Sequence, residues 1–348
     1  MEMNASRIST FKELLKQRIL IIDGAMGTML QRYGLEEEDF RNESLKEHQI
    51  DLKGNNDLLV LTKPEVVKEV HLQYFEAGAD IVETNTFGAT SIAQSEYGLS
   101  HLAYEMNLAA ARIAREAAEE CSESSGRSCF VAGAIGPTNI TLSASADVDD
   151  ASTRASTWDE VYAAYVEQVK GLIDGGSDII LIETIFDVLN SKAAIKATLD
   201  VFEELEIELP IIISVTFIQE GGDRTVFGQS VEAFWETIRH AKPICVGLNC
   251  GLGASGLRGK LQTLSRIADT NIHIYPNAGL PNPLSPSGFD ETPEITAAHI
   301  QHLAKDGLLN LVGGCCGTTP PHIKAIAQAM KGIVPREIPT HERLPSYA

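Results

Sequence analysis

Three cysteines are the residues of this sequence best suited to chemistry. Cys250 follows the apolar run 244–249, and the vicinal pair Cys315 and Cys316 follows the apolar run 310–313. Three thiolates suit a tetrahedral Zn²⁺ and leave one position open, as a catalytic zinc requires. Adjacent residues of a strand face opposite sides, so the vicinal pair can bind one ion only if the chain turns there, and the flanking glycines allow that turn. The spacing therefore indicates a metal site.

Other interpretations of the same cysteines stay open at this point. The vicinal pair could be a redox dithiol, although a strained vicinal disulfide is uncommon. The glycine-rich segment 312–317 could be a phosphate-binding loop, although thiols serve no phosphate. The three remaining cysteines are predicted to be small buried apolar side chains: Cys121, Cys129 and Cys245.

Polar residues also follow the other predicted strands. They include Asp23, Gly24, Glu83, Thr84, Glu183, Thr216 and Asn277. No lysine or histidine stands at these positions, which argues against Schiff-base aldolase chemistry and a histidine-rich hydrolase site. His299 and His302 lie one helical turn apart, and we expect both on the surface of an outer helix.

Eight short apolar runs alternate with helical patterns and are expected to position these residues. The predicted strands are 18–23, 80–84, 130–135, 178–183, 210–216, 244–249, 273–276 and 310–313. Continuous apolar runs are typical of parallel strands buried on both faces, and the helices predicted at 64–77, 158–174 and 294–306 are each followed by glycine. The order predicts an α/β fold, a (β/α)₈ TIM barrel with chemistry at the carboxyl ends of its strands. A doubly wound open sheet is the alternative, but no Gly-x-Gly-x-x-Gly sequence follows the first strand.

The chain divides into three expected parts. Residues 1–17 form an N-terminal extension or helix, 18–334 the barrel, and 335–348 a linker or tail. Two irregular polar connections, 33–62 and 142–157, are expected at the mouth of the barrel.

Composition excludes several classes of protein. The 348 residues carry 48 acidic and 28 basic side chains, a net charge of −20, which disfavours nucleic-acid binding. No apolar stretch of about 18 residues predicts a membrane helix, and the polar N-terminus predicts no secretory signal. We expect a cytoplasmic protein, in which six cysteines are not a disulfide framework.

Eight short motifs occur in order along almost the whole chain. They are DGAMGTM (23–29), LKGNNDL (52–58), ETNTF (83–87), GPTN (136–139), ETIFD (183–187), GLNC (247–250), PNAGLP (276–281) and GGCCGT (313–318). Together they resemble the homocysteine-binding module of cobalamin-dependent methionine synthases. GLNC followed by GGCCGT is shared by the wider homocysteine S-methyltransferase family, whereas the LKGNND and ETNTF forms point to the methionine synthases.

The resemblance implies a role for individual residues. Cys250, Cys315 and Cys316 match the zinc ligands, and Glu183 matches the residue that binds the substrate ammonium. Asp23 and Gly24 match the segment that holds the substrate carboxylate, and the strand end around Thr84 matches another part of the amino-acid pocket. Asp23 could instead contact the amine or orient its own turn. The Asn277 carboxamide oxygen could complete the zinc site without substrate, or Asn277 could serve the turn alone.

The implied function is zinc-dependent methyl transfer to the sulfur of L-homocysteine, giving methionine. The methyl donor would be methylcobalamin on another module or chain, so that cobalamin- and folate-binding modules would be partners. The cobalamin-binding Asp-x-His-x-x-Gly motif is absent, and we expect either a fragment or a separate subunit. One alternative is a stand-alone transferase that uses S-methylmethionine or betaine, and the other is a non-catalytic zinc-binding module.

Overall fold

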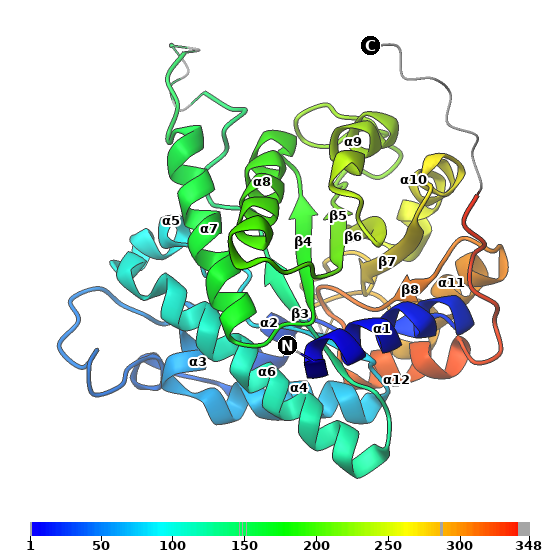
Figure 1. Ribbon diagram of the computed structural model, residues 1–348, viewed down its shortest axis with the longest axis horizontal. Helices are drawn as coiled ribbons and strands as arrows, with labels where there is room; N and C mark the ends of the chain where they lie inside the picture. The colour runs from blue at the N-terminus through cyan, green and yellow to red at the C-terminus, as the bar shows by residue number, and fades with distance from the viewer. Residues whose placement is uncertain (1, 146, 148, 151, 286–287, 340–348) are drawn as a thin grey trace.

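Eight parallel strands alternate with helices around a closed barrel (Figure 1). The computed structural model describes residues 2–145, 147, 149–150, 152–285 and 288–339, without the side chains of residues 2–4. The strands are β1 (Leu20–Ile21), β2 (Ile81–Glu83), β3 (Phe130–Ile135), β4 (Ile179–Ile185), β5 (Ile211–Val215), β6 (Cys245–Gly253), β7 (Asn271–Asn277) and β8 (Leu311–Val312). Each of the eight predicted strands is therefore confirmed.

Hydrogen bonds between the first two strands close the sheet. The strand order runs β1-β8-β7-β6-β5-β4-β3-β2, and a parallel bridge joins Ile22 to Ile81. The Asp23 N–H donates to the Ile81 carbonyl at 3.0 Å, and the Asp80 N–H donates to the Ile21 carbonyl at 2.7 Å. The TIM barrel is confirmed, and the alternative of an open sheet is excluded.

The helices surround this barrel and follow the strands in turn. They are α1 (Glu2–Gln17), α2 (Met26–Leu30), α3 (Leu59–Thr62), α4 (Pro64–Ala77), α5 (Ser91–Gln94), α6 (Ala103–Ser125), α7 (Trp158–Asp174), α8 (Val188–Leu205), α9 (Val231–Ile238), α10 (Ala254–Ile267), α11 (Pro293–Lys305) and α12 (Pro320–Ala329). The predicted bounds of α4 and α7 agree with the structure. The connection 33–62, expected to be irregular, contains α3 and short 3₁₀ turns. Among the described residues, none of these helices has the length and apolarity to cross a membrane.

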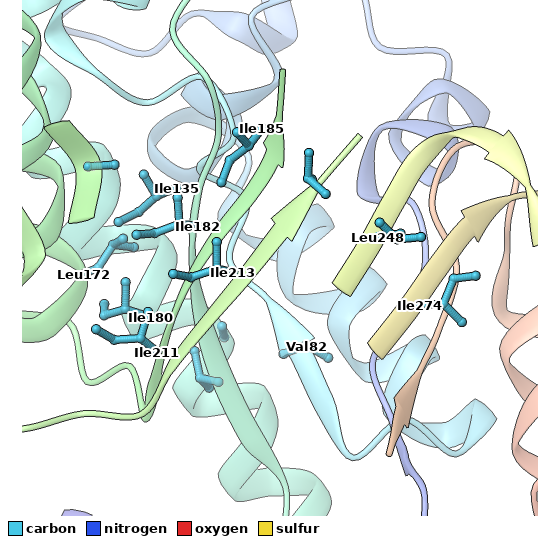
Figure 2. Close-up of a cluster of buried hydrophobic side chains, with 14 of the residues drawn as sticks. Val82, Ile135, Leu172, Ile180, Ile182, Ile185, Ile211, Ile213, Leu248 and Ile274 are labelled. Carbon is cyan, nitrogen blue, oxygen red and sulfur yellow. The ribbon is translucent and has the colours of Figure 1, made fainter. Parts of the chain in front are cut away.

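Alternation along the strands separates an inner from an outer core. Aliphatic, aromatic and small side chains fill the barrel interior, namely Leu20, Ile22, Ile81, Phe130, Ala132, Ile179, Leu181, Ile212, Cys245, Tyr275 and Leu311. Their neighbours in sequence point outward against the helices; Figure 2 shows Val82, Ile180, Ile182, Ile211 and Ile213 in this outer layer, with Leu172 of α7. Such layers make the barrel a packed core, and barrels of this kind bind their ligands at the carboxyl ends of the strands.

The N-terminal helix and the beginning of the C-terminal tail both pack on the barrel. Phe11 of α1 is fully buried and meets Phe130 edge to face, with ring centroids 5.4 Å apart. The buried Arg336 guanidinium donates hydrogen bonds to Ser265 and to the carbonyls of Ala268 and Thr270. The structure thus attaches the first residues of the expected tail to the barrel, while 340–348 lie outside the described residues.

Candidate active site

A bulge at the end of β6 turns Cys250 toward the mouth of the barrel. The pairing of β6 with β7 is regular up to Asn249 and resumes at Gly253. Cys250 has φ 56° and Gly251 φ 67°, so two successive residues adopt the left-handed conformation. At Gly251 a Cβ atom would lie 2.3 Å from the Phe217 carbonyl oxygen, so a side chain is excluded there. The bulge therefore depends on glycine next to the cysteine.

The segment after β8 carries the other two cysteines in a tight turn. The Cys315 N–H donates to the Pro276 carbonyl at 2.8 Å, and the Cys316 carbonyl accepts from the Ala278 N–H at 3.0 Å. At Gly314 a Cβ atom would lie 2.4 Å from the Thr318 hydroxyl oxygen. This turn is the one that the flanking glycines predict, and it is fixed to β7.

The structure brings the three predicted ligand thiols together. The sulfur atoms of Cys250, Cys315 and Cys316 lie within 4.8 Å of one another, and those of Cys250 and Cys316 are 3.8 Å apart. All three are free thiols, and each is partly accessible. Hydrogen bonds from the other two thiols lower the pKa of Cys316 to about 3, whereas hydrogen bonds with them, together with burial, raise the pKa of Cys315. The group accommodates one thiolate by itself; three thiolates require a cation among them.

Three carboxyl groups lie at the same end of the barrel as the thiols, Asp23 and Glu183 buried and Glu83 half-buried. Asp23 follows β1, Glu83 ends β2 and Glu183 lies in β4, each at the carboxyl end of the barrel. The Glu83 N–H donates to Asp23 Oδ2 at 3.1 Å, while Asp23 Oδ1 is buried without a hydrogen-bond partner. No arginine or lysine forms an ion pair with any of the three among the described residues. These carboxyl groups could therefore pair with a cation that the described residues do not supply.

Burial and nearby negative charge raise the pKa of all three carboxyl groups. Burial raises the pKa of Glu183 to about 8, against an opposing hydrogen bond from Thr184 and with a further increase from Cys250. Burial and the charge of Glu183 also raise the pKa of Asp23 and of Glu83, although the Glu83 N–H opposes the shift of Asp23. An ammonium ion placed among the three would stabilise their ionised forms.

These shifts predict that the ligand-free protein loses stability as the pH rises. A carboxyl group whose pKa is raised in the folded state binds more protons there than in the unfolded chain, so its contribution falls with rising pH. For Glu183 the window runs from its ordinary value of 4.5 to about 8. We expect the thermal unfolding midpoint, followed by circular dichroism, to decrease across this window. The decrease should be smaller in Glu183→Gln, and an identical slope in both proteins would contradict the assignment.

The other predicted site residues differ in their placement. Gly24 is packed where a Cβ atom would lie 2.8 Å from the Thr318 hydroxyl, so the turn after β1 touches the cysteine turn. The Thr84 hydroxyl accepts from the Ala134 N–H at 2.9 Å and lies 2.6 Å from Thr86 Oγ1. Thr84 thus joins β2 to β3 on the outer face, and its contact with substrate stays a prediction. Asn277 ends β7, and its Oδ1 is buried without a hydrogen-bond partner.

The sequence placed Glu83 at the end of a predicted strand but assigned it no role in the site. Its orientation follows from the structure, in which Ile81 points into the barrel, because alternation then sends Glu83 inward and Thr84 outward. The predicted surface histidines are confirmed: His299 is paired with Glu291 at 3.0 Å, and His302 is exposed. Cys121, Cys129 and Cys245 are buried, as expected.

Comparisons with known proteins identify the family and the fold. The family model described as homocysteine S-methyltransferase matches residues 20–330. The fold resembles the oxidized form of homocysteine methyltransferase MmuM from Escherichia coli, with a TM-score of 0.68 and 22% identity over 90% of this chain and 96% of that chain. Its metallated form gives a TM-score of 0.66 and 24% identity over the same shares. At these identities, the structural likeness shows a common fold.

Proposed function

Because the chain belongs to the homocysteine S-methyltransferase family, we propose that it activates L-homocysteine at a zinc ion held by Cys250, Cys315 and Cys316. The observation that carries this proposal is the pairing of two groups at one end of the barrel. Three thiols lie within 4.8 Å of one another, and the carboxyl groups of Asp23, Glu83 and Glu183 have no cationic partner among the described residues. An amino thiol fits both groups, because its sulfur can bind a metal ion held by the thiols and its ammonium group can pair with the carboxyl groups.

The donor set fits zinc in number and in chemistry. Three thiolates within reach of one ion leave a fourth position for substrate, and the buried Asn277 Oδ1 is a candidate for that position without substrate. When bound, zinc makes a coordinated thiol deprotonated at neutral pH, so the homocysteine sulfur becomes nucleophilic without a general base. This explains why the site needs no histidine.

The amino-acid end of the substrate is bound by the chain itself. Glu183, with Asp23 and Glu83 beside it, would accept charge-assisted hydrogen bonds from the ammonium group. Backbone N–H groups in the turn at Asp23 and Gly24 would hold the carboxylate. With its ammonium group and its carboxylate held, homocysteine places its sulfur beside the three cysteine thiols. Orientation of this kind contributes strongly to the rate of transfer reactions.

For the methyl donor we propose methylcobalamin on another module or chain, from the resemblance of LKGNND and ETNTF to the methionine synthases. The second candidate is a stand-alone transferase with S-methylmethionine or betaine, favoured by the match over 96% of the MmuM chain. A non-catalytic zinc module is the third. Turnover with each donor in separate assays distinguishes them: methylcobalamin alone, S-methylmethionine alone, betaine alone, or none.

Homocysteine binding is expected to release more protons than binding of L-homoserine. The two ligands share an ammonium and a carboxylate and differ in the thiol, which is protonated in solution because its pKa is about 8.5. Loss of the thiol proton at the zinc site should add close to one proton at pH 7. Calorimetric titration in buffers of different ionisation enthalpy measures the difference.

Two controls make this measurement decisive. Homoserine accounts for protons that leave Asp23, Glu83 and Glu183 when the ammonium group arrives. Zinc-free protein should show no difference between the two ligands. If the zinc-loaded protein binds homocysteine but releases as many protons with homocysteine as with homoserine, the sulfur stays protonated and the proposal is wrong.

A further inference from the structure

Asn249 links the two halves of the proposed site. It is fully buried in β6, directly before Cys250, and it is the last residue in regular register with β7. Alternation along β6 points its side chain into the barrel, since Cys245 lies in the interior core. Asn249 thus stands between the metal-binding thiols and the carboxyl groups.

Its carboxamide is saturated with hydrogen bonds. Oδ1 accepts from the Thr184 N–H at 3.0 Å and from the Ser214 hydroxyl at 2.6 Å. Nδ2 donates to Thr184 Oγ1 at 2.6 Å and to Glu183 Oε2 at 3.3 Å. One side chain of β6 therefore holds residues of β4 and β5, of which β4 is not its neighbour in the sheet.

The residues that Asn249 holds are in strained or irregular backbone. Thr184 has φ 54°, and the register between β4 and β5 shifts between Ile182 and Ile185. Cys250, on the other side of Asn249, has φ 56° in the bulge of β6. A β-branched residue in the left-handed region persists only when its surroundings fix it. The carboxamide, bonded to both the N–H and the hydroxyl of Thr184, provides that constraint.

We propose that Asn249 is a positioning residue that fixes the separation of Glu183 from Cys250 and so selects amino thiols by chain length. The inference rests on the proposed function, in which Glu183 binds the ammonium group and Cys250 holds the metal. Homocysteine has two methylenes between its α-carbon and its sulfur, and cysteine has one. If the site is rigid, cysteine is too short to reach both Glu183 and the metal ion at Cys250. If the bulges in β4 and β6 can move, cysteine can reach both.

The test is the ratio of homocysteine to cysteine affinity, measured by calorimetry on the zinc-loaded protein. Asn249→Asp keeps the shape and one acceptor but removes both donated hydrogen bonds, and Asn249→Ala removes all four. We expect the ratio to fall by about tenfold or more in both, because one methylene is discriminated by roughly 10- to 200-fold in a fitted pocket. The zinc content should stay unchanged.

Two further variants separate positioning from stability. Thr198→Val removes a buried hydroxyl that bonds within α8 to the Ala194 carbonyl, and it should leave the ratio unchanged. Ser214→Ala removes one hydrogen bond of Asn249 and should lower the ratio less than Asn249→Asp. If both Asn249 variants lose zinc, the Ser214→Ala variant becomes the test. An unchanged ratio of homocysteine to cysteine affinity in Ser214→Ala would then overturn the inference.

The two proposals fail in different ways. A wild-type protein that binds homocysteine no more tightly than homoserine would contradict the proposed function. A wild-type protein that prefers homocysteine over homoserine, with the same homocysteine-to-cysteine ratio in folded Asn249 variants, would contradict only the role of Asn249.

Discussion

Replacement of Cys250, Cys315 or Cys316 by alanine is expected to remove zinc and abolish methyl transfer to homocysteine. Zinc bound by four ligands in folded peptides has a binding free energy of about 10–16 kcal/mol, so each ligand contributes on the order of 3 kcal/mol. Loss of one thiolate should weaken zinc binding by at least about a hundredfold. Among the described residues, no other histidine, cysteine, aspartate or glutamate belongs to this group.

The matched control for these variants is Cys245→Ala. Cys245 lies on β6, the strand that carries Cys250, and points into the barrel. It is fully buried in the apolar interior, apart from the three ligand thiols. This variant loses packing and should unfold at a lower temperature, yet it should keep one zinc per chain by atomic absorption. Retention of zinc in all three ligand variants would show that the metal site is wrong.

The barrel could be predicted from the sequence because the same pattern, an apolar run followed by a helical pattern, is repeated along the chain. Eight apolar runs alternate with eight helical patterns, and each run is long enough to form one buried strand. The thiol group was also predictable, since strand ends converge at one face and the glycines around Cys315 and Cys316 indicate a turn.

The details of the site could not be predicted in the same way. The left-handed conformations of Thr184 and Cys250 arise from the bulges in β4 and β6, and a residue at positive φ that is not glycine leaves no mark in the sequence. Those bulges decide which side chains face the substrate. The contact of Asn249 with Thr184 depends on the curvature of the sheet, which brings β4 and β6, the two neighbours of β5, together on the inner face and places residues 65 positions apart within a hydrogen bond.

Glu183→Gln is expected to weaken homocysteine binding by about ten- to a hundredfold and to leave zinc in place. The change removes one charged acceptor from the ammonium group, and a hydrogen bond to a charged group contributes about 1.5–3 kcal/mol. Glutamine has nearly the same shape, and its oxygen can still accept from Asn249 and Thr184, as Oε2 of Glu183 does. Calorimetric titration of zinc-loaded protein with homocysteine measures the loss.

The same substitution should stabilise the ligand-free protein, and the two effects together identify the role of Glu183. Asp23, Glu83 and Glu183 have no cationic partner among the described residues and repel one another once ionised, and burial already raises the pKa of Glu183 to about 8. A neutral glutamine removes that repulsion, so the unfolding midpoint at pH 8 should rise while homocysteine affinity falls. A residue with only a structural role would lose stability on substitution, as expected for Glu291→Gln, which keeps only one of the two oxygens that contact Thr296 and His299 and should leave homocysteine affinity unchanged. A Glu183→Gln protein that is less stable than the wild type and binds homocysteine normally would place Glu183 in the scaffold, and the ammonium group would then have to bind at Asp23 and Glu83.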